Sequence, residues 1–142
     1  MKYRKGIFIV VYRKEKNNIM YLILKRKLHW KGWEFPKGGV EKKENIKTAI
    51  LRELKEEIGT KPAKITSHNV KGKYKYKNKL QDRKEIGQTY SLYSAEIKCR
   101  KIKIDKKEHS AYAWKTLREA KKMLTWNNQK NCLRIVNNLI SG

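Results

Sequence analysis

Three glutamates, Glu53, Glu56 and Glu57, stand three and four residues apart in the segment 35–60. On a helix of about 3.6 residues per turn, this spacing places their carboxylates on one face within about one turn. Like charges this close repel each other, and a hard divalent cation held by oxygen ligands offsets that repulsion. The spacing therefore predicts a metal site. The alternative is an ordinary solvated helix in which lysine and glutamate alternate.

The same segment carries the signals that would position such a site. A glycine pair, Gly38 and Gly39, precedes the helix and lets the backbone approach a ligand closely. Gly59 is placed to end the helix in a left-handed conformation. A separate apolar stripe predicts that another face of the helix packs on a core, through Ile46, Ala49, Ile50, Leu54 and Ile58.

The segment resembles the Nudix box, in which a glycine, a glutamate, an Arg-Glu pair, a Glu-Glu pair and a second glycine recur at fixed spacing. The matching residues are Gly38, Glu44, Arg52, Glu53, Leu54, Glu56, Glu57 and Gly59. The departure is Thr60, where the family usually has an aliphatic residue. The resemblance implies an α/β (α+β) fold of the Nudix type, an α/β/α sandwich with a mixed central sheet.

The resemblance also implies catalytic and metal-binding roles by position. Glu53, Glu56 and Glu57 would hold magnesium, with manganese as an alternative, and Gly38 would add its backbone carbonyl. Arg52 would orient a box carboxylate through a charge-assisted hydrogen bond, and Glu44 would have a mainly structural or outer role.

The general base is left open between two carboxylates. Glu53 in the box is one candidate, and Glu108 in the later stretch KKEHSAYAW is the other, either as base or as an additional metal ligand. For Glu108 the alternative is a solvated acid at the end of a strand. The reaction implied is attack of water on a pyrophosphate link, which a divalent ion assists by neutralising charge.

Residues outside the box resemble two kinds of Nudix enzyme. The run WEFPKGG is similar to asymmetrical diadenosine tetraphosphate hydrolases and to RNA 5′-pyrophosphohydrolases, and Lys37 would face the phosphates. The later segment EHSAYAWKTLREA and the tail favour a hydrolase that splits diadenosine tetraphosphate into ATP and AMP. Gly39 slightly favours the RNA enzyme. A non-catalytic nucleotide or RNA binding module is a further alternative.

Aromatic side chains near the box are candidates for stacking on a nucleobase. The resemblance suggests Tyr74 and Tyr76 for this role, with His29 contributing from the loop that precedes the glycine pair. Ordinary packing or surface positions are the alternative for each of them. With Lys37, Gly38 and Gly39, they complete the predicted substrate-binding set.

Composition predicts the setting of the protein. The chain has 142 residues, which fits one domain over residues 1–142, and a formal net charge of +24. This charge would attract polyanions such as nucleotides or RNA, unless it reflects only a lysine-rich composition. Cys99 and Cys132 form no CxxC pair, and neither a membrane span nor a signal peptide is present, so we expect a soluble cytoplasmic monomer.

Hydrophobic periodicity predicts the elements around the box. Strands are expected at 6–12, 19–24, 65–76, 89–97 and from Glu108, with an aromatic loop at 29–36 and a mobile hairpin loop at 77–85. Thr116 and Glu119 form a predicted capping box at the start of a helix. An amphipathic helix is expected over 128–140.

Overall fold

The computed structural model describes residues 2–76 and 84–141. The elements, in chain order, are β1 (Tyr3–Glu15), β2 (Asn18–Arg26), β3 (Gly32–Glu34), β4 (Lys37–Gly39), α1 (Ile46–Ile58), β5 (Lys64–Lys75), β6 (Gly87–Glu96), β7 (His109–Lys115), α2 (Leu117–Met123) and α3 (Asn127–Ile140). Most of the hairpin loop expected at 77–85 lies outside the described residues.

The sheet is mixed, as predicted, and the long strand β1 lies at its centre in the order β3-β2-β1-β6-β5. Strand β6 runs parallel to β1, whereas β2 and β4 pair with it in antiparallel fashion. The first half of β1 pairs with β4, from Gly6 opposite Gly39, and its far end pairs with β2, from Tyr12 opposite Tyr21. This change of partner separates β4 from β2 and leaves room for a cavity beside β1.

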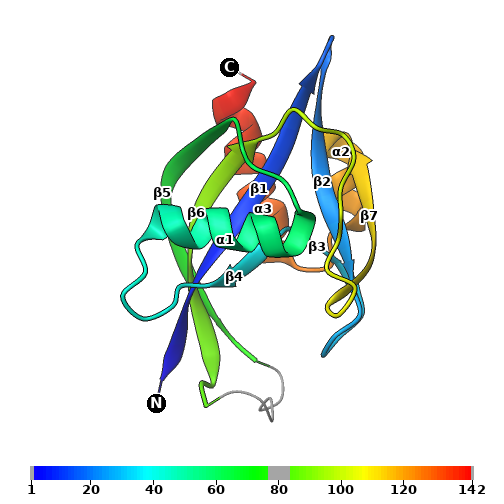
Figure 1. The fold of residues 1–142 in the computed structure, drawn as a ribbon. Helices are drawn as coiled ribbons and strands as arrows, with labels where there is room; N and C mark the ends of the chain where they lie inside the picture. Colours follow the sequence, from blue (N-terminus) through cyan, green and yellow to red (C-terminus); the bar gives the residue numbers. More distant parts are fainter. Residues whose placement is uncertain (1, 77–83, 142) are drawn as a thin grey trace.

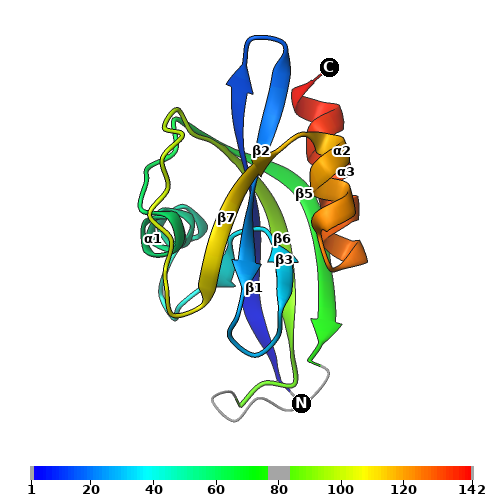
Figure 2. The ribbon, with the colours of Figure 1, turned by 90° about the vertical axis from the view of Figure 1, so that its right-hand side faces the viewer.

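Helices cover both faces of the sheet (Figures 1 and 2). Alternate residues of β1 point to opposite faces, so Ile7, Ile9 and Val11 join one core cluster while Phe8 and Val10 join the other. The first cluster packs under α1, and the second packs under α2 and α3. The predicted α/β/α sandwich is thereby confirmed.

Helix α1 begins and ends where its sequence signals predict. The side chain of Asn45 accepts a hydrogen bond from the Thr48 amide at 2.8 Å, which caps the first turn. Gly59 has φ 69° and ends the helix in the left-handed region. The apolar stripe is buried through Ala49, Ile50, Leu54 and Ile58, and the Glu53 carboxylate on the acidic face packs against Gly38 of β4.

Several local predictions are confirmed and two short strands were missed. Thr116 and Glu119 form the capping box of α2, and α3 begins at Asn127. The segment expected as a loop over 29–36 contains β3, and the glycine turn forms β4. Three residues are too few to show a strand period. Both cysteines are free, and no helix in the described ranges is long and apolar enough to cross a membrane.

Candidate active site

A cavity of about 760 Å³ opens beside β4 and below α1. Residues from β1, β2, β4, α1, β5, β6 and the start of α3 line it, together with the loops before β3 and β7. The lining contains the predicted residues His29, Lys37, Gly38, Arg52, Glu53, Glu56, Tyr74, Tyr76 and Glu108. The fold therefore brings together most of the candidate site from positions far apart in the sequence.

The three glutamates of α1 differ in burial. Glu53 and Glu57 have exposed fractions of 7% and 2%, whereas the side chain of Glu56 is 57% exposed. One helical face therefore runs from the interior at Glu57 to the rim of the cavity at Glu56. Such a gradient lets carboxylates reach a ligand in the cavity from several depths.

Arg52 holds the acidic face in one arrangement. Its guanidinium donates two hydrogen bonds to the Glu44 carboxylate, at 2.8 and 2.9 Å. It also donates to the Glu53 carboxylate at 2.7 Å and to the Gly39 carbonyl at 2.8 Å. A planar guanidinium suits such a fork of acceptors. The arrangement ties the helix to β4 and holds the Glu53 carboxylate against the Arg52 guanidinium.

Gly38 is needed because the Glu53 carboxylate packs directly on it. A Cβ built at this position would overlap the carboxylate atoms of Glu53. The absent side chain thus brings the β4 backbone into direct contact with the acidic face of α1. Gly39 is likewise crowded, by the Arg4 guanidinium, so the glycine pair serves close packing of charged groups rather than a sharp turn.

Burial raises the pKa of both inner glutamates. The pKa of Glu57 lies well above its ordinary value because the carboxyl is buried and faces the charges of Glu34, Glu53 and Glu108. Its Oε2 accepts only one described hydrogen bond, from the Lys37 amide at 3.0 Å. Burial raises the pKa of Glu53 to about 7 despite its contact with Arg52. Burial therefore disfavours the charged form of both carboxyl groups.

Glu34, which sequence reasoning missed, is the centre of a buried charge network. Its side chain is fully buried, and Oε2 accepts hydrogen bonds from Arg26 at 3.1 Å and His109 at 2.8 Å. Lys37 Nζ lies 3.4 Å from Oε1. Burial alone would raise the pKa of Glu34, but Lys37, His109 and Arg26 together lower it to about 2.

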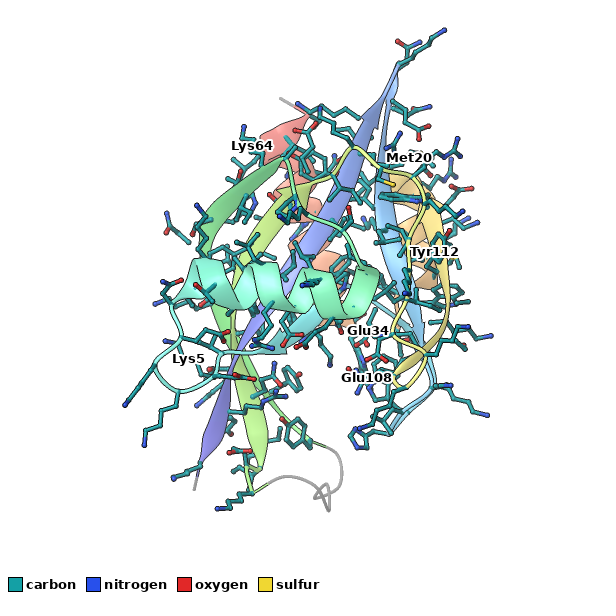
Figure 3. All side chains as sticks on the ribbon, in the orientation of Figure 1. Lys5, Met20, Glu34, Lys64, Glu108 and Tyr112 are labelled. Atoms are coloured by element: carbon teal, nitrogen blue, oxygen red, sulfur yellow. The ribbon has the colours of Figure 1, made fainter. Side chains whose placement is uncertain are left out.

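Glu108 reaches the cavity from the loop that leads into β7. Its Oε1 lies 3.3 Å from Arg26 Nη1, so Arg26 joins Glu108 to Glu34. Figure 3 shows Glu34 and Glu108 near each other, below α1. The sequence predicted Glu108 but not Arg26, because the pairing of β2 with β7 and β3 that unites them is long-range.

The oxygen atoms at the site are of the kinds that bind a hard divalent cation. Carboxylates and a backbone carbonyl are the oxygen ligands that magnesium prefers, and Glu57 is a buried carboxylate with no described cationic side chain hydrogen-bonded to it. Within the described residues, however, no three carboxylate, imidazole or thiol groups form a ready-made metal cluster. Arg52 lies 2.7 Å from Glu53 and 3.5 Å from Glu56, which draws these carboxylates toward the guanidinium.

Lys37 faces the cavity between aromatic side chains. Its Nζ donates to the Tyr74 hydroxyl at 3.4 Å and lies 5.5 Å from the Tyr74 ring and 5.8 Å from the Trp30 ring. Tyr76 meets Tyr74 edge to face at 6.1 Å. His29 lines the same cavity from a loop position with φ 72°.

Sequence reasoning also missed an aromatic pair in the cavity wall. Trp30 and Trp126 meet edge to face with ring centroids 5.1 Å apart, although 96 positions separate them in the chain. Arg4, Gln88 and Asn128 add polar lining. No local pattern indicates such a pair, because α3 reaches the loop before β3 only through the packed fold.

Comparison with known proteins places these features in a family. A family model described as NUDIX domain matches residues 2–134. An RNA pyrophosphohydrolase of Nitratiruptor sp. is 39% identical over 80 residues, which cover 54% of this chain and 52% of that protein. The chain spans about half or less of the length of the curated relatives it matches.

Solved structures share the fold over nearly the whole chain. A C. elegans Ap4A hydrolase binary complex superposes with a TM-score of 0.73 at 24% identity, covering 98% of each chain. A NUDIX hydrolase from Listeria monocytogenes superposes with a TM-score of 0.80 at 20% identity, covering 99% of this chain and 95% of the other. At such identity the likeness establishes the fold alone.

Proposed function

The chain belongs to the NUDIX domain family, and we propose that it hydrolyses a phosphoric anhydride bond of a nucleoside polyphosphate with the help of a divalent ion. The observation that carries this proposal is a pair of carboxyl groups on α1: Glu53, which lines the cavity, and Glu57, which is buried and whose pKa burial raises well above its ordinary value. Carboxylates held in this way are costly unless a cation or a proton joins them.

The ion would be held by the acidic face of α1 and the adjoining strand. We assign the Gly38 carbonyl, Glu53, Glu56 and Glu57 as its ligands, with Glu108 as an additional one. Magnesium is the expected ion and manganese the alternative. A bound divalent ion supplies neutralisation of phosphate charge and a lowered pKa of water.

The other residues of the site would orient the reacting groups and accept the proton of the attacking water. Arg52 orients Glu53 through the 2.7 Å hydrogen bond, and Lys37 offers its ammonium group to the phosphates. A general base works best with a pKa near the working pH, which Glu53 meets at about 7. Glu108, paired with Arg26, is the other candidate for the proton acceptor.

The cavity walls favour a dinucleoside polyphosphate such as diadenosine tetraphosphate. The cavity is lined by two separate aromatic pairs, Trp30 with Trp126 and Tyr74 with Tyr76, and Lys37 Nζ lies within 6 Å of one ring of each pair. Flat rings suit nucleobases, and a cation between them suits the phosphate chain. We infer ATP and AMP as the products.

A triphosphorylated RNA 5′ end is the second candidate substrate. The curated relatives are named RNA pyrophosphohydrolase, and the net charge of +24 suits a polyanion. The 80 matched residues cannot include both Arg4 and Gln129, which are the first and the last cavity-lining residues along the chain. The relatives therefore support the chemistry more directly than the choice of substrate.

A product assay tests the proposal. Diadenosine tetraphosphate and a 5′-triphosphorylated RNA are presented separately with magnesium, with a chelator and with the Glu57→Gln variant as controls. ATP plus AMP supports the first candidate, and pyrophosphate or phosphate released from RNA supports the second. If the intact protein hydrolyses no pyrophosphate compound with any divalent ion, the alternative of a binding module replaces the proposal. Full activity of Glu57→Gln would refute the metal assignment.

A further inference from the structure

The wall of the active-site cavity contains a buried amide whose donor end is unpaired. Gln88 is 4% exposed and lines the cavity, and its Nε2 forms no hydrogen bond with any residue in the described ranges. Its Oε1 accepts a hydrogen bond of 3.4 Å from the Tyr76 hydroxyl, so only the acceptor end of the amide has a partner. A buried donor without an acceptor destabilises the fold, because it has lost its hydrogen bonds to water. A ligand that supplies an acceptor would remove this cost.

Arg4 is a second unpaired donor in the same wall. Its side chain is half-buried and lines the cavity. Within residues 2–76 and 84–141, its guanidinium forms neither an ion pair nor a hydrogen bond with another side chain. A guanidinium has five N–H donors and no acceptor, so all of them remain available to a ligand.

Strand pairing places Arg4 and Gln88 on one face of the sheet. Arg4 of β1 lies opposite Gln88 of β6, and Gln88 lies opposite Tyr74 of β5. Residues opposite one another in neighbouring strands point to the same side of a sheet. Phe8, four residues after Arg4 in β1, shares this face and also lines the cavity. The two unpaired donors therefore reach the cavity from one cross-strand row.

Two glycines make room for these donors. Gly6 of β1 lies opposite Gly39 of β4, which runs beside β1 below α1 (Figure 1). A Cβ at Gly6 would overlap the Gln88 amide, with Nε2 as the nearest atom, and a Cβ at Gly39 would overlap the Arg4 guanidinium. The free end of the amide therefore extends over β1, the strand that carries Arg4. Both polar groups lie directly on backbone that has no side chains.

The chemistry of the two groups selects a ligand that accepts hydrogen bonds and carries negative charge. The free groups are a neutral N–H donor and a guanidinium, whereas the acceptor end of the Gln88 amide is bonded to Tyr76. Phosphate oxygens only accept, and their hydrogen bonds to a guanidinium are charge-assisted. Adenine presents an amino donor beside its acceptor, and this donor would find no free acceptor here. Because the Gln88 amide is neutral, its selection of an acceptor does not depend on the net charge of the chain.

We propose that Arg4 and Gln88 form a binding subsite for one phosphate group of the polyphosphate chain, separate from the acidic face of α1. The subsite rests on the proposed function and deepens it, since both use the same cavity. Burial raises the pKa of Glu53, and the positive charge of Arg4 is one of the effects that oppose this rise. Arg4 is therefore close enough to Glu53 for neighbouring phosphates of one chain to contact both places.

Binding of inorganic tripolyphosphate, ATP and GTP to the protein tests the proposal. Gln88→Met removes the amide at similar side-chain length and without a change in charge, and Arg4→Gln removes the guanidinium. Arg134→Gln is the matched control for charge, because Arg134 is exposed on α3 and is absent from the described lining of the cavity. Isothermal titration calorimetry at about 150 mM salt, which weakens non-specific attraction, gives the affinities. A chelator prevents metal-dependent hydrolysis during the titration.

Each cavity variant should bind all three ligands about tenfold more weakly than the wild type, because a hydrogen bond to a charged group is lost. The control should stay within about twofold. Weaker binding of GTP or ATP with unchanged binding of tripolyphosphate would overturn the proposal in favour of base recognition. Equal losses in Arg4→Gln and Arg134→Gln would also overturn it, as would a wild type that does not bind tripolyphosphate.

Thermal unfolding separates a ligand subsite from a role of Gln88 in the fold. The Tm of Gln88→Met should equal or exceed that of the wild type, because the variant no longer buries an unpaired donor. A lower Tm with unchanged affinities would show that Gln88 serves the fold alone, and would overturn the proposal.

Magnesium-dependent hydrolysis of diadenosine tetraphosphate distinguishes failure of the subsite from failure of the proposed function. Hydrolysis by the wild type, together with unchanged affinities in both cavity variants, would refute the subsite and leave the proposed function in place. The expected losses of affinity without hydrolysis of any pyrophosphate compound would support the subsite and count against the proposed function.

Discussion

Replacing Glu34 by glutamine should destabilise the protein strongly, although the two side chains have nearly the same shape. The Glu34 carboxylate is fully buried and faces Arg26, His109 and Lys37 at 3.1, 2.8 and 3.4 Å. An uncharged amide cannot balance the charges of Arg26 and Lys37, and its NH₂ group turns a donor toward other donors. Removal of one partner from a buried charged network costs about 3–5 kcal/mol.

The pKa of Glu34 gives a second figure for the loss in the free energy of unfolding. Its value falls from 4.5 in the unfolded chain to about 2 in the fold, a difference equivalent to about 3 kcal/mol. Because the folded pKa is lowered, this stability is fully present above pH 4.5 and is lost as the pH falls toward 2. Glu34→Gln should therefore lower the free energy of unfolding by about 3 kcal/mol at pH 7 and flatten its dependence on pH between 4.5 and 2.

Urea unfolding followed by tryptophan fluorescence measures both quantities. Glu41→Gln is the matched control, since the Glu41 side chain is 71% exposed and lies 3.8 Å from Arg52, so its effect should stay within about 0.5 kcal/mol. A loss below about 1 kcal/mol for Glu34→Gln at pH 7 would refute the reasoning. So would an acid dependence identical to that of the wild type.

Two further predictions concern the acidic face of α1. We expect magnesium to raise the Tm of the wild type. Gly38→Ala should keep the fold but abolish this rise, because the new Cβ overlaps the Glu53 carboxylate. Circular dichroism and a thermal scan with and without the ion measure both effects, and an equal rise in the variant would contradict the prediction. The raised pKa of Glu53, about 7 against 4.5 unfolded, means that the folded state binds the extra proton. Without a divalent ion, the free energy of unfolding should therefore fall by about 3 kcal/mol as the pH rises from 4.5 to 7, and Glu53→Gln should remove much of this fall; an equally steep fall in the variant would contradict it.

The sequence predicts the acidic face well because its geometry is local. Glu53, Glu56 and Glu57 lie on one helix, and their spacing sets their common face before any tertiary contact forms. Gly38 and Arg52 lie within one short stretch of the same segment. Their contacts in the structure follow from a strand and a helix joined by a short loop.

The network around Glu34 could not be predicted in this way. It requires β2, β3 and β7 to pair in register, so that His109 meets Arg26 and Glu34 although His109 is distant from them in sequence. The strand β3 is too short to show a period, and Glu34 reads there as one polar residue between two aromatic ones. A buried acid flanked by Trp33 and Phe35 was the available signal, and it indicates burial without naming the partners.

The two most buried carboxylates of the site differ in what surrounds them, and this difference assigns their roles. Glu34 lies among cations that lower its pKa to about 2, so its charge is already balanced and it serves to position Lys37 and Arg26. Glu57 is equally buried, but carboxylates surround it and its pKa is raised. A buried acid of this kind must take up a proton or a cation. Burial and the neighbouring carboxylates outweigh the effect of Arg26 at Glu57, whereas Lys37, Arg26 and His109 outweigh burial at Glu34. This contrast is the physical reason to propose a divalent ion beside Glu57 and not beside Glu34.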